Sequence, residues 1–371
     1  MTTIGRKMTL EISSNRRNEI KNIVYSALLH SNQLSIPVKI GTIIRSYSNI
    51  KMITYSSQVR KHGISYGELI ISAETKDSYV VYCHSKNKYC IYYNDLDLNI
   101  TSCNRVRWNL AHELGHVLLK HHQLCSKEKL LRGDFFLENI DDYNYKIAEL
   151  EANYFAQLIL VPHAALLGFK IMNQKQLKDI CQISDKAAKR RYYEFVEWKS
   201  HINAQDEYDN HIFHLYYDFI YKRKCKKCDA GIIQRYGNYC PICGNKKTLE
   251  WGDGDQMKYP LLDTYENGKL KECPTCHNEI TNIEGNFCQI CGRNLVNLCV
   301  NDECSNTLPL PSNARYCPIC GCQSSFYNAN LLNDWDYQEL SFVNDGFMTI
   351  PDEPPAKLSL EDDIDEELPF N

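Results

Sequence analysis

The chain has 371 residues, of which 43% are hydrophobic and 24% charged. These values are ordinary for globular proteins, so they exclude a disordered, collagen-like or coiled-coil chain, and the length leaves room for two or three domains. The net charge of −4 is nearly balanced, so affinity for nucleic acid would need a local patch. No apolar stretch could span a bilayer, and the start lacks the apolar block of a secretory signal, so we expect a cytoplasmic protein without a membrane partner.

The first half of the chain alternates helix-like and strand-like patterns. Residues 16–31 repeat apolar side chains at helical spacing and predict a first helix. Residues 79–83 and 89–93 are rich in β-forming residues and flank a turn-like segment, so they predict a hairpin. Residues 107–121 and 147–160 predict two further helices, the second of which stops before a proline.

The helix predicted at 107–121 contains AHELGH, an H-E-x-x-H motif. His112 and His116 are one helical turn apart, so both imidazoles project from one face and can bind a single zinc ion. Glu113 stands at the edge of that face, where its carboxylate can accept a proton from a zinc-bound water. The alternative is a polar face with two solvated histidines, but the apolar neighbours place this helix in a core, where imidazoles need partners.

A hydrolytic zinc site needs a third protein ligand and an open position for water. His122 follows the motif at a distance that would suit a ligand if a glycine turned the chain between them. Leu119 occupies that position, so the helix has no reason to turn. We therefore discount His122 and, with it, His121.

A glutamate of the second helix is the other candidate for the third ligand. Glu149 and Glu151 lie on different faces of that helix, so at most one meets the metal. Glu149 begins an E-x-x-A-N arrangement, in which Asn153 could hydrogen-bond a ligand histidine and small Ala152 lets the helices approach. We favour Glu149 and keep Glu151 in reserve.

Peptide hydrolysis also needs hydrogen-bond donors for the developing oxyanion, besides the metal. Tyr143 and Tyr145 lie just before the Glu149 helix and are candidates. Purely structural roles are the alternative for both.

The stretch RVRWNLAHELGHVLL, followed by ELEANYFAQLILVP and preceded by YCIYYN, resembles the ImmA/IrrE metallo-endopeptidases, a gluzincin-like group. The resemblance covers roughly residues 16–198. It implies zinc held by His112, His116 and Glu149, with Glu113 as catalytic base. It also implies a protein substrate, since members of this family are associated with cleavage of helix-turn-helix repressors in mobile elements and damage responses.

Residues 174–198 are broken near Ile183 and outline a helix-turn-helix. The cations of its second half would suit phosphate contact. The alternative is a segment that packs under the peptidase and exposes a solvated basic face, and we favour it because similar segments accompany the peptidase in the resembling family. The cations are Lys186, Lys189, Arg190 and Arg191.

Twelve of the 18 cysteines form three repeated modules in the second half. A chain without an export signal is more consistent with metal binding than with disulfides. Four thiolates leave no open coordination position, so the modules predict structural zinc ribbons, whose small cores need the metal to fold. The sets are Cys225, Cys228, Cys240 and Cys243; Cys273, Cys276, Cys288 and Cys291; and Cys299, Cys304, Cys317 and Cys320.

Two points about the ribbons stay open at this stage. In the third module Cys322 could replace Cys320, and the spacing between Cys299 and Cys304 is wider than in the other pairs. The first module carries a basic run at residues 222–227 that could contact nucleic acid. Contact with a protein is equally compatible, and the acidic tail could compete for the basic run.

We therefore predict an α+β fold: a small zincin-like peptidase domain of helices and a short antiparallel sheet, three zinc ribbons and an acidic disordered tail. The predicted function is a zinc endopeptidase that cuts a regulatory protein, with one catalytic and about three structural zinc ions. The rivals are a zinc-ribbon adaptor or nucleic-acid binder on an inactive platform, and a regulator that binds DNA through the helix-turn-helix-like segment. The predicted boundaries are 1–200 for the peptidase domain, 201–221 for a connector, 222–250, 270–295 and 296–325 for the ribbons, and 341–371 for the tail.

Overall fold

The computed structural model describes most of the chain up to residue 336. The chain divides into two compact units, residues 1–335 and 336–371, and the predicted tail lies outside the described residues. None of the helices in the described part is long and apolar enough to cross a bilayer. The described ranges are 11–32, 34–83, 85–96, 103–124, 129–130, 142–201, 206–255 and 259–336.

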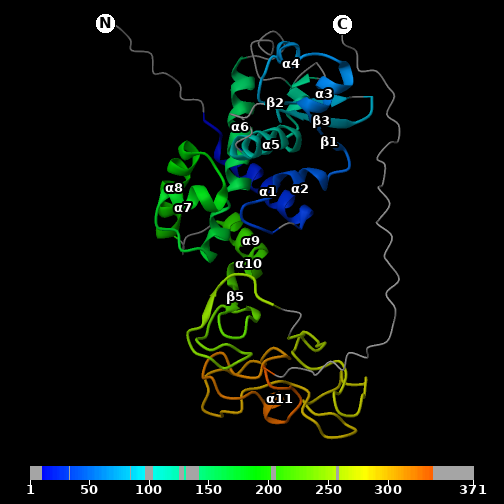
Figure 1. The fold of residues 1–371 in the computed structure, drawn as a ribbon, viewed down its shortest axis with the longest axis vertical. Helices are drawn as coiled ribbons and strands as arrows, with labels where there is room; N and C mark the ends of the chain where they lie inside the picture. The colour runs from blue at the N-terminus through cyan, green and yellow to red at the C-terminus, as the bar shows by residue number, and fades with distance from the viewer. Residues whose placement is uncertain are drawn as a thin grey trace, which may run out of the picture. The chain divides into compact units, whose positions relative to one another are not determined.

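A four-stranded sheet with the strand order β1-β3-β2-β4 organises the first half (Figure 1). The predicted hairpin is confirmed, because β2 and β3 pair antiparallel, and β2 also pairs antiparallel with β4. On the other side of β3, β1 pairs in parallel, so the sheet is mixed rather than wholly antiparallel. The strands are β1 (Ile50–Thr54), β2 (Ser78–Cys83), β3 (Lys88–Tyr93) and β4 (Lys129–Leu130).

Helices accompany this sheet and supply most of the main hydrophobic core. The helix-turn-helix outline is confirmed as α7 and α8, and Ser184 caps α8 by accepting a hydrogen bond from the Ala187 N–H. The elements are α1 (Ser14–Ser31), α2 (Ile40–Arg45), α3 (Tyr55–His62), α4 (Tyr66–Ala73), α5 (Cys103–Leu118), η1 (His121–Leu124), α6 (Asp142–Leu160), η3 (His163–Gly168), α7 (Gln174–Cys181) and α8 (Asp185–Ser200).

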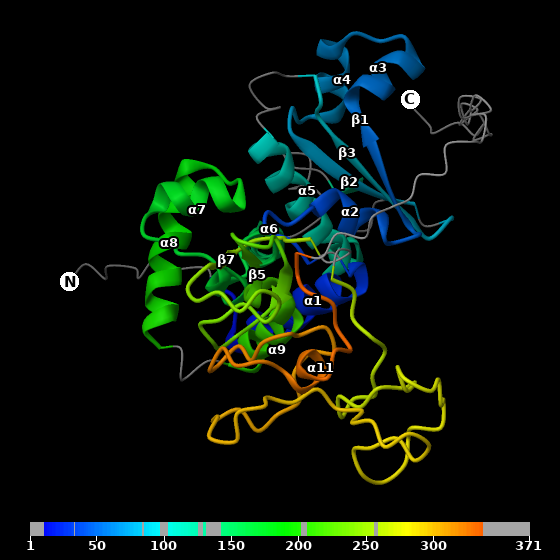
Figure 2. The ribbon, with the colours of Figure 1, turned by 60° about the horizontal axis from the view of Figure 1, so that its bottom comes forward.

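α5 and α6 lie side by side (Figure 2), and small residues set the distance between them. A Cβ atom at Gly115 would stand 3.2 Å from the Cα of Ala152 and 3.2 Å from the ring of Phe155. Ala152 and Phe155 are fully buried. The small side chain of Ala152 thus allows the close approach of the two helices that the sequence predicted.

The segment predicted as a connector is helical in its described part, residues 206–221. It forms α9 (Glu207–Leu215) and α10 (Tyr217–Tyr221). Buried side chains recur every four residues and join the main core, a helical pattern that the many polar and tyrosine residues obscure in the sequence. These side chains are Tyr208, Ile212, Tyr216 and Ile220.

The cysteine-rich half consists mostly of turns around three buried clusters. Its regular elements are the three-stranded antiparallel sheet β6-β5-β7 and the short helix α11. Trp251 of β7 donates a hydrogen bond from Nε1 to the Phe219 carbonyl at 3.0 Å and packs against the ring of Phe169. The bounds are β5 (Lys222–Cys225), β6 (Gly231–Ile233), β7 (Leu249–Trp251) and α11 (Ser325–Asn328).

The contact between α5 and α6 leads to a stability prediction. Replacing Ala152 by leucine should lower the free energy of unfolding by about 1–3 kcal/mol, because the added carbons overfill a closed site. Ala187→Leu, on a partly exposed face of α8, should change it by less than about 0.5 kcal/mol. Urea unfolding of both variants measures the difference, and equal effects would show that the contact is not tightly packed.

Candidate metal centre

α5 and α6 bring the side chains of His112, His116 and Glu149 to one point. The two histidine Nε2 atoms lie 3.0 Å apart, and they lie 3.4 Å and 3.3 Å from the two oxygens of Glu149. Nitrogen and oxygen ligands at tetrahedral corners about 2.0–2.1 Å from a zinc ion would lie about 3.3–3.4 Å apart. The three side chains therefore have the spacing that one zinc ion requires, and the fourth corner is left for water.

The charge of Glu149 also suits a metal ligand. Burial alone would raise the pKa of its carboxyl, but hydrogen bonding with His112 and His116 outweighs burial and holds that pKa well below its usual range. The carboxylate is therefore ionised at neutral pH. The imidazoles themselves are only 0% and 6% exposed, so a cation at this point would satisfy nitrogen atoms that water barely reaches.

Asn153, one turn beyond Glu149, lies where the sequence predicted it. Its Oδ1 is 3.1 Å from His112 Nδ1, so it accepts the hydrogen bond that an imidazole offers when its other nitrogen faces a metal. Such a contact orients the ring.

His116 has a longer series of partners, which the sequence did not reveal. Its Nδ1 lies 2.8 Å from Nδ1 of His121, and His121 Nε2 lies 3.1 Å from Glu151. Arg16 of α1 donates two hydrogen bonds to the same Glu151 carboxylate, at 3.0 Å and 2.7 Å. Glu151, our reserve ligand, thus bonds to His121 and Arg16, while Glu149 faces the two histidines.

The position of His121 corrects our expectation that the helix continues through residue 121. α5 ends at Leu118, and Lys120 takes the left-handed conformation with φ of 59°. The chain therefore turns without the glycine that we considered necessary, and His121 comes back to His116. His122 instead lies 2.8 Å from the hydroxyl of Tyr89 through its Nδ1.

The hydrogen bonds from His116 to Arg16 can point in only one direction if His116 Nε2 faces a metal. His116 Nδ1 must then carry the proton and donate it to His121, whose other nitrogen donates to Glu151. Burial lowers the pKa of His121 to about 4, so its ring is neutral and can accept this bond. Burial opposes ionisation of Glu151, but His121 and Arg16 lower its pKa to about 2.

The predicted catalytic base is also held in place. Glu113 is 2% exposed, and its Oε1 accepts a 2.8 Å hydrogen bond from Ser78 Oγ at the start of β2. This contact links the first strand of the hairpin to the motif helix. Nothing in the sequence around Ser78 marks it as a partner, because the contact spans 35 positions.

The two tyrosines proposed as oxyanion donors belong to the first turns of α6. Tyr143 is about half exposed, whereas Tyr145 packs against the core. Tyr145, four residues before Glu149, shares its helix face, and Tyr143 does not. The donor role of either tyrosine stays a prediction.

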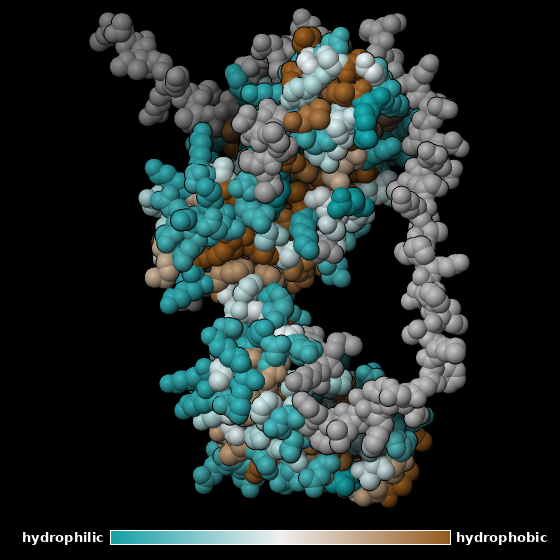
Figure 3. All heavy atoms as spheres, viewed as in Figure 1, coloured by the Kyte–Doolittle hydropathy of each residue, from teal (hydrophilic) through white to brown (hydrophobic). Residues whose placement is uncertain are grey.

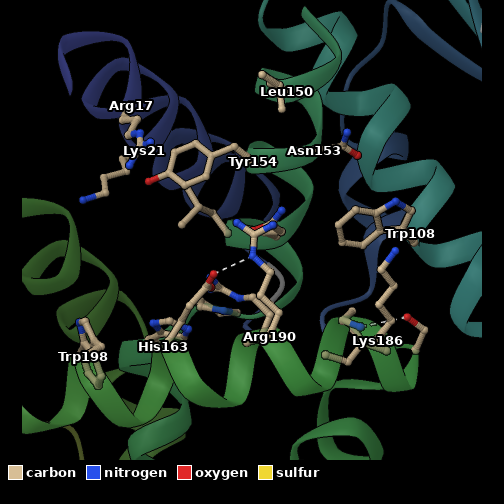
Figure 4. Close-up of a pocket in the computed structure, with 18 of the residues that line it drawn as sticks. Arg17, Lys21, Trp108, Leu150, Asn153, Tyr154, His163, Lys186, Arg190 and Trp198 are labelled. Carbon is tan, nitrogen blue, oxygen red and sulfur yellow. Dashed lines mark hydrogen bonds and ion pairs between the residues drawn. The ribbon is translucent and has the colours of Figure 1, made fainter. Parts of the chain in front are cut away.

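A cavity of about 1270 Å³ lies between α1, α5, α6 and α8 and reaches Asn153, but His112, Glu113, His116 and Glu149 do not line it. Figure 4 shows Trp108 of α5, Tyr154 of α6 and Lys186 of α8 around it. Arg190 also lines it and pairs with Glu194 at 2.9 Å. Helices α7 and α8 are thus a wall of the domain that holds the metal centre, as we expected when we favoured packing over DNA contact.

The second half contains three groups of four cysteines, each with all sulfur atoms within 4.8 Å of one another. In each group two pairs of sulfur atoms lie 3.5 or 3.7 Å apart. Sulfur ligands about 2.3 Å from a zinc ion would lie about 3.8 Å apart at tetrahedral corners. These groups are wider than the histidine and glutamate group, as the larger sulfur requires.

The membership of each group agrees with the predicted sets. In the third module the fourth member is Cys320, and Cys322 instead accepts a hydrogen bond through its carbonyl from the Cys317 N–H. Cys299 and Cys304 are further apart in the sequence than the other pairs. The Cys304 N–H donates a hydrogen bond to the carbonyl of Asn301, which lies between them.

The basic run of ribbon 1 is largely neutralised within the chain. Lys222 pairs with Asp253, Lys224 pairs with Asp229, and Lys226 pairs with Glu250, at 2.7–2.9 Å. Lys227 lies over the ring of Trp335, and Arg223 donates to two carbonyls. Phosphate would have to compete with these partners, so the structure weakens the argument for nucleic acid that the sequence suggested.

This α+β domain has the architecture of a metallopeptidase-type domain. Two paired helices bring two histidines and a glutamate to one point, and the motif helix also carries the buried Glu113. Residues 60–193 match the model of the Peptidase_M78 family, the IrrE N-terminal-like domain. The resemblance found in the sequence is thus confirmed for this segment, while α1 and the three ribbons lie outside it. A comparison with curated proteins gives no match.

Metal analysis should find about four zinc ions per chain, because the described residues form four groups of suitable spacing. The ion with an open position should be removed by chelator well before the three held by four thiolates. Timed chelation followed by elemental analysis measures both. A total of only three ions per chain, all removed at the same rate, would contradict a separate fourth site.

The series from His116 to Arg16 predicts a selective effect on metal affinity. Glu151→Gln should weaken zinc binding at the histidine site by about 10–100-fold, because an amide that donates to His121 reverses the hydrogen bonds. Glu19→Gln is the matched control, since Glu19 is the other carboxylate bonded to Arg16, at 2.8 Å on the surface. Chelator competition measures both constants, and equal effects would point to charge alone.

Proposed function

We propose that the protein is a zinc-dependent endopeptidase, with His112, His116 and Glu149 as the metal ligands. The observation that carries the proposal is the 3.0–3.4 Å spacing between the Nε2 atoms of His112 and His116 and the two carboxylate oxygens of Glu149, on the helix that also carries the buried Glu113. A zinc ion held there supplies a Lewis acid that activates water and polarises the carbonyl of a peptide bond.

The protein's own groups account for the proton transfers. Ser78 donates to one oxygen of Glu113 and so fixes the carboxylate, whose other oxygen takes the proton from the attacking water. The same group then delivers the proton to the leaving nitrogen. Asn153 and His121 hold the ligand imidazoles in the orientation that this geometry requires.

The substrate that we propose is a regulatory protein of the helix-turn-helix repressor class. The support is the family resemblance of residues 60–193.

We propose that the zinc ribbons dock a protein. Figure 3 shows apolar side chains, in brown, on the surface of the cysteine-rich half, and Leu261, Ile280 and Leu308 are strongly exposed. The cations of ribbon 1 are already partnered. The described cysteines form no disulfides, which supports a reducing compartment such as the cytoplasm.

Glu113→Gln tests the reaction. The variant should retain zinc, because Glu113 is not among the three grouped ligands, and cleavage should fall by about 10²–10⁴-fold with the loss of the proton acceptor. Co-expression with candidate repressors, followed by intact-mass analysis, measures cleavage, and Glu19→Gln is the matched control. A fully zinc-loaded wild type that cuts none of them would favour the adaptor, and a variant as fast as wild type would remove Glu113 from its role.

A further inference from the structure

The second half of each ribbon contains the same turn, which we call the knuckle. The knuckles are YCPICG at 239–244, FCQICG at 287–292 and YCPICG at 316–321. In each, the carbonyl of the first cysteine accepts from the glycine N–H at 2.9 Å, and the cysteine N–H donates to the residue five positions on at 2.7–2.9 Å. The three knuckles therefore have one backbone structure.

The knuckles of ribbons 1 and 3 pair with each other reciprocally. The carbonyl of Pro241 accepts from the two residues that precede Cys317, at 2.7 and 2.9 Å. The carbonyl of Pro318 accepts from the two residues that precede Cys240, at 3.0 and 3.2 Å. Each knuckle gives two N–H groups and one carbonyl, so the contact has approximate two-fold symmetry.

The aromatic ring of each knuckle covers the glycine of the other. The ring of Tyr316 lies 3.0 Å from where a Cβ atom of Gly244 would be, and the ring of Tyr239 lies 2.6 Å from that position at Gly321. Any side chain at these glycines would block the contact.

The knuckle of ribbon 2 has the same groups with no such partner in the described residues. Phe287 is 61% exposed and Ile290 is 71% exposed, and no atom lies within 4 Å of the Cβ position at Gly292. The two residues that precede Cys288 are Asn286 and Phe287. Their N–H groups and the Gln289 carbonyl have no backbone partner among the described residues. Glutamine replaces proline here, but the accepting group is the main-chain carbonyl, which both residues have.

We propose that the ribbon 2 knuckle is a homodimer contact, in which it pairs with the ribbon 2 knuckle of a second copy of this chain. The surface that pairs in ribbons 1 and 3 is complementary to itself, and a second copy supplies each missing group: two donors, one acceptor, a ring and an uncovered glycine. Such an isologous contact uses the same surface on both chains, so it produces a dimer and no larger assembly. A knuckle of six residues is small beside the roughly 20–30 residues that each partner gives to a standard interface, so the dimer is weak and depends on concentration.

Analytical ultracentrifugation of the zinc-loaded full chain tests the proposal. Wild type should pass from monomer to dimer with increasing concentration, up to on the order of 100 µM. Phe287→Ser should raise the dimer dissociation constant by about tenfold or more, whereas Phe287→Tyr, which restores the tyrosine of the other knuckles, should preserve it. The matched control is Ile280→Ser, which removes an equally exposed apolar side chain of ribbon 2 outside the knuckle. Zinc content must be unchanged in all three variants.

A photo-crosslinking benzoylphenylalanine at position 287 identifies the occupant. The proposal requires a crosslink to residues 286–292 of a second chain. A crosslink to the acidic tail at 341–371 or to another protein would overturn it. A chain that stays monomeric at every concentration, or a dimer that Phe287→Ser does not weaken, would also overturn it.

Discussion

The close approach of α5 and α6 at Gly115 and Ala152 is the constraint on which the metal centre depends. His112 and His116 flank Gly115 on one helix, and on the other Ala152 lies directly before Asn153 and one turn after Glu149. A Cβ atom at Gly115 would already crowd Ala152 at 3.2 Å, so no larger residue fits without moving the helices apart. Any such movement would separate imidazoles and carboxylate that now lie 3.3–3.4 Å from each other. Packing of small residues therefore decides whether the polar groups can share an ion.

The polar groups behind His116 extend the site beyond the two helices. A buried imidazole, a second imidazole and a carboxylate would each be costly alone, and they become tolerable because every one is hydrogen-bonded to the next and Arg16 supplies the final charge. The left-handed conformation of Lys120 has a conformational cost, which the bonds made by His121 offset. Arg16 belongs to α1, outside the segment 60–193 that matches the family. The domain that holds the candidate metal centre thus includes α1 as well as the matched segment.

Much of this domain could be predicted from residue spacing, because helical periodicity and H-E-x-x-H depend on neighbours along the chain. The choice of Glu149 over Glu151 rested on the E-x-x-A-N arrangement that follows Glu149, since helix geometry shows only that the two glutamates occupy different faces. We discounted His121 because no glycine follows the motif to turn the chain, yet Lys120 takes the left-handed conformation and turns it. Ser78 and Arg16 could not be found at all, because their contacts span 35 and 135 positions and depend on how the sheet and α1 pack. The ion pairs of the basic run of ribbon 1 were hard to foresee for a related reason, because Glu250 and Asp253 lie more than 20 residues after the run.

The ribbons show how modules with little core can still be interdependent. Each has a few buried side chains around its thiolates, so a metal ion would supply most of the folding free energy. Yet their cores are not separate, because Phe326 of α11, which follows ribbon 3 in the chain, packs in the core of ribbon 2. Asn297 of ribbon 3 donates to the carbonyls of Pro311 and Ala314 and accepts from the Phe326 N–H, so it fixes the residue that packs in ribbon 2. Ribbons 1 and 3 are joined by their knuckles. The boundaries that the sequence suggests therefore separate metal sites rather than independent folding units, and a change in one ribbon would be felt in the others.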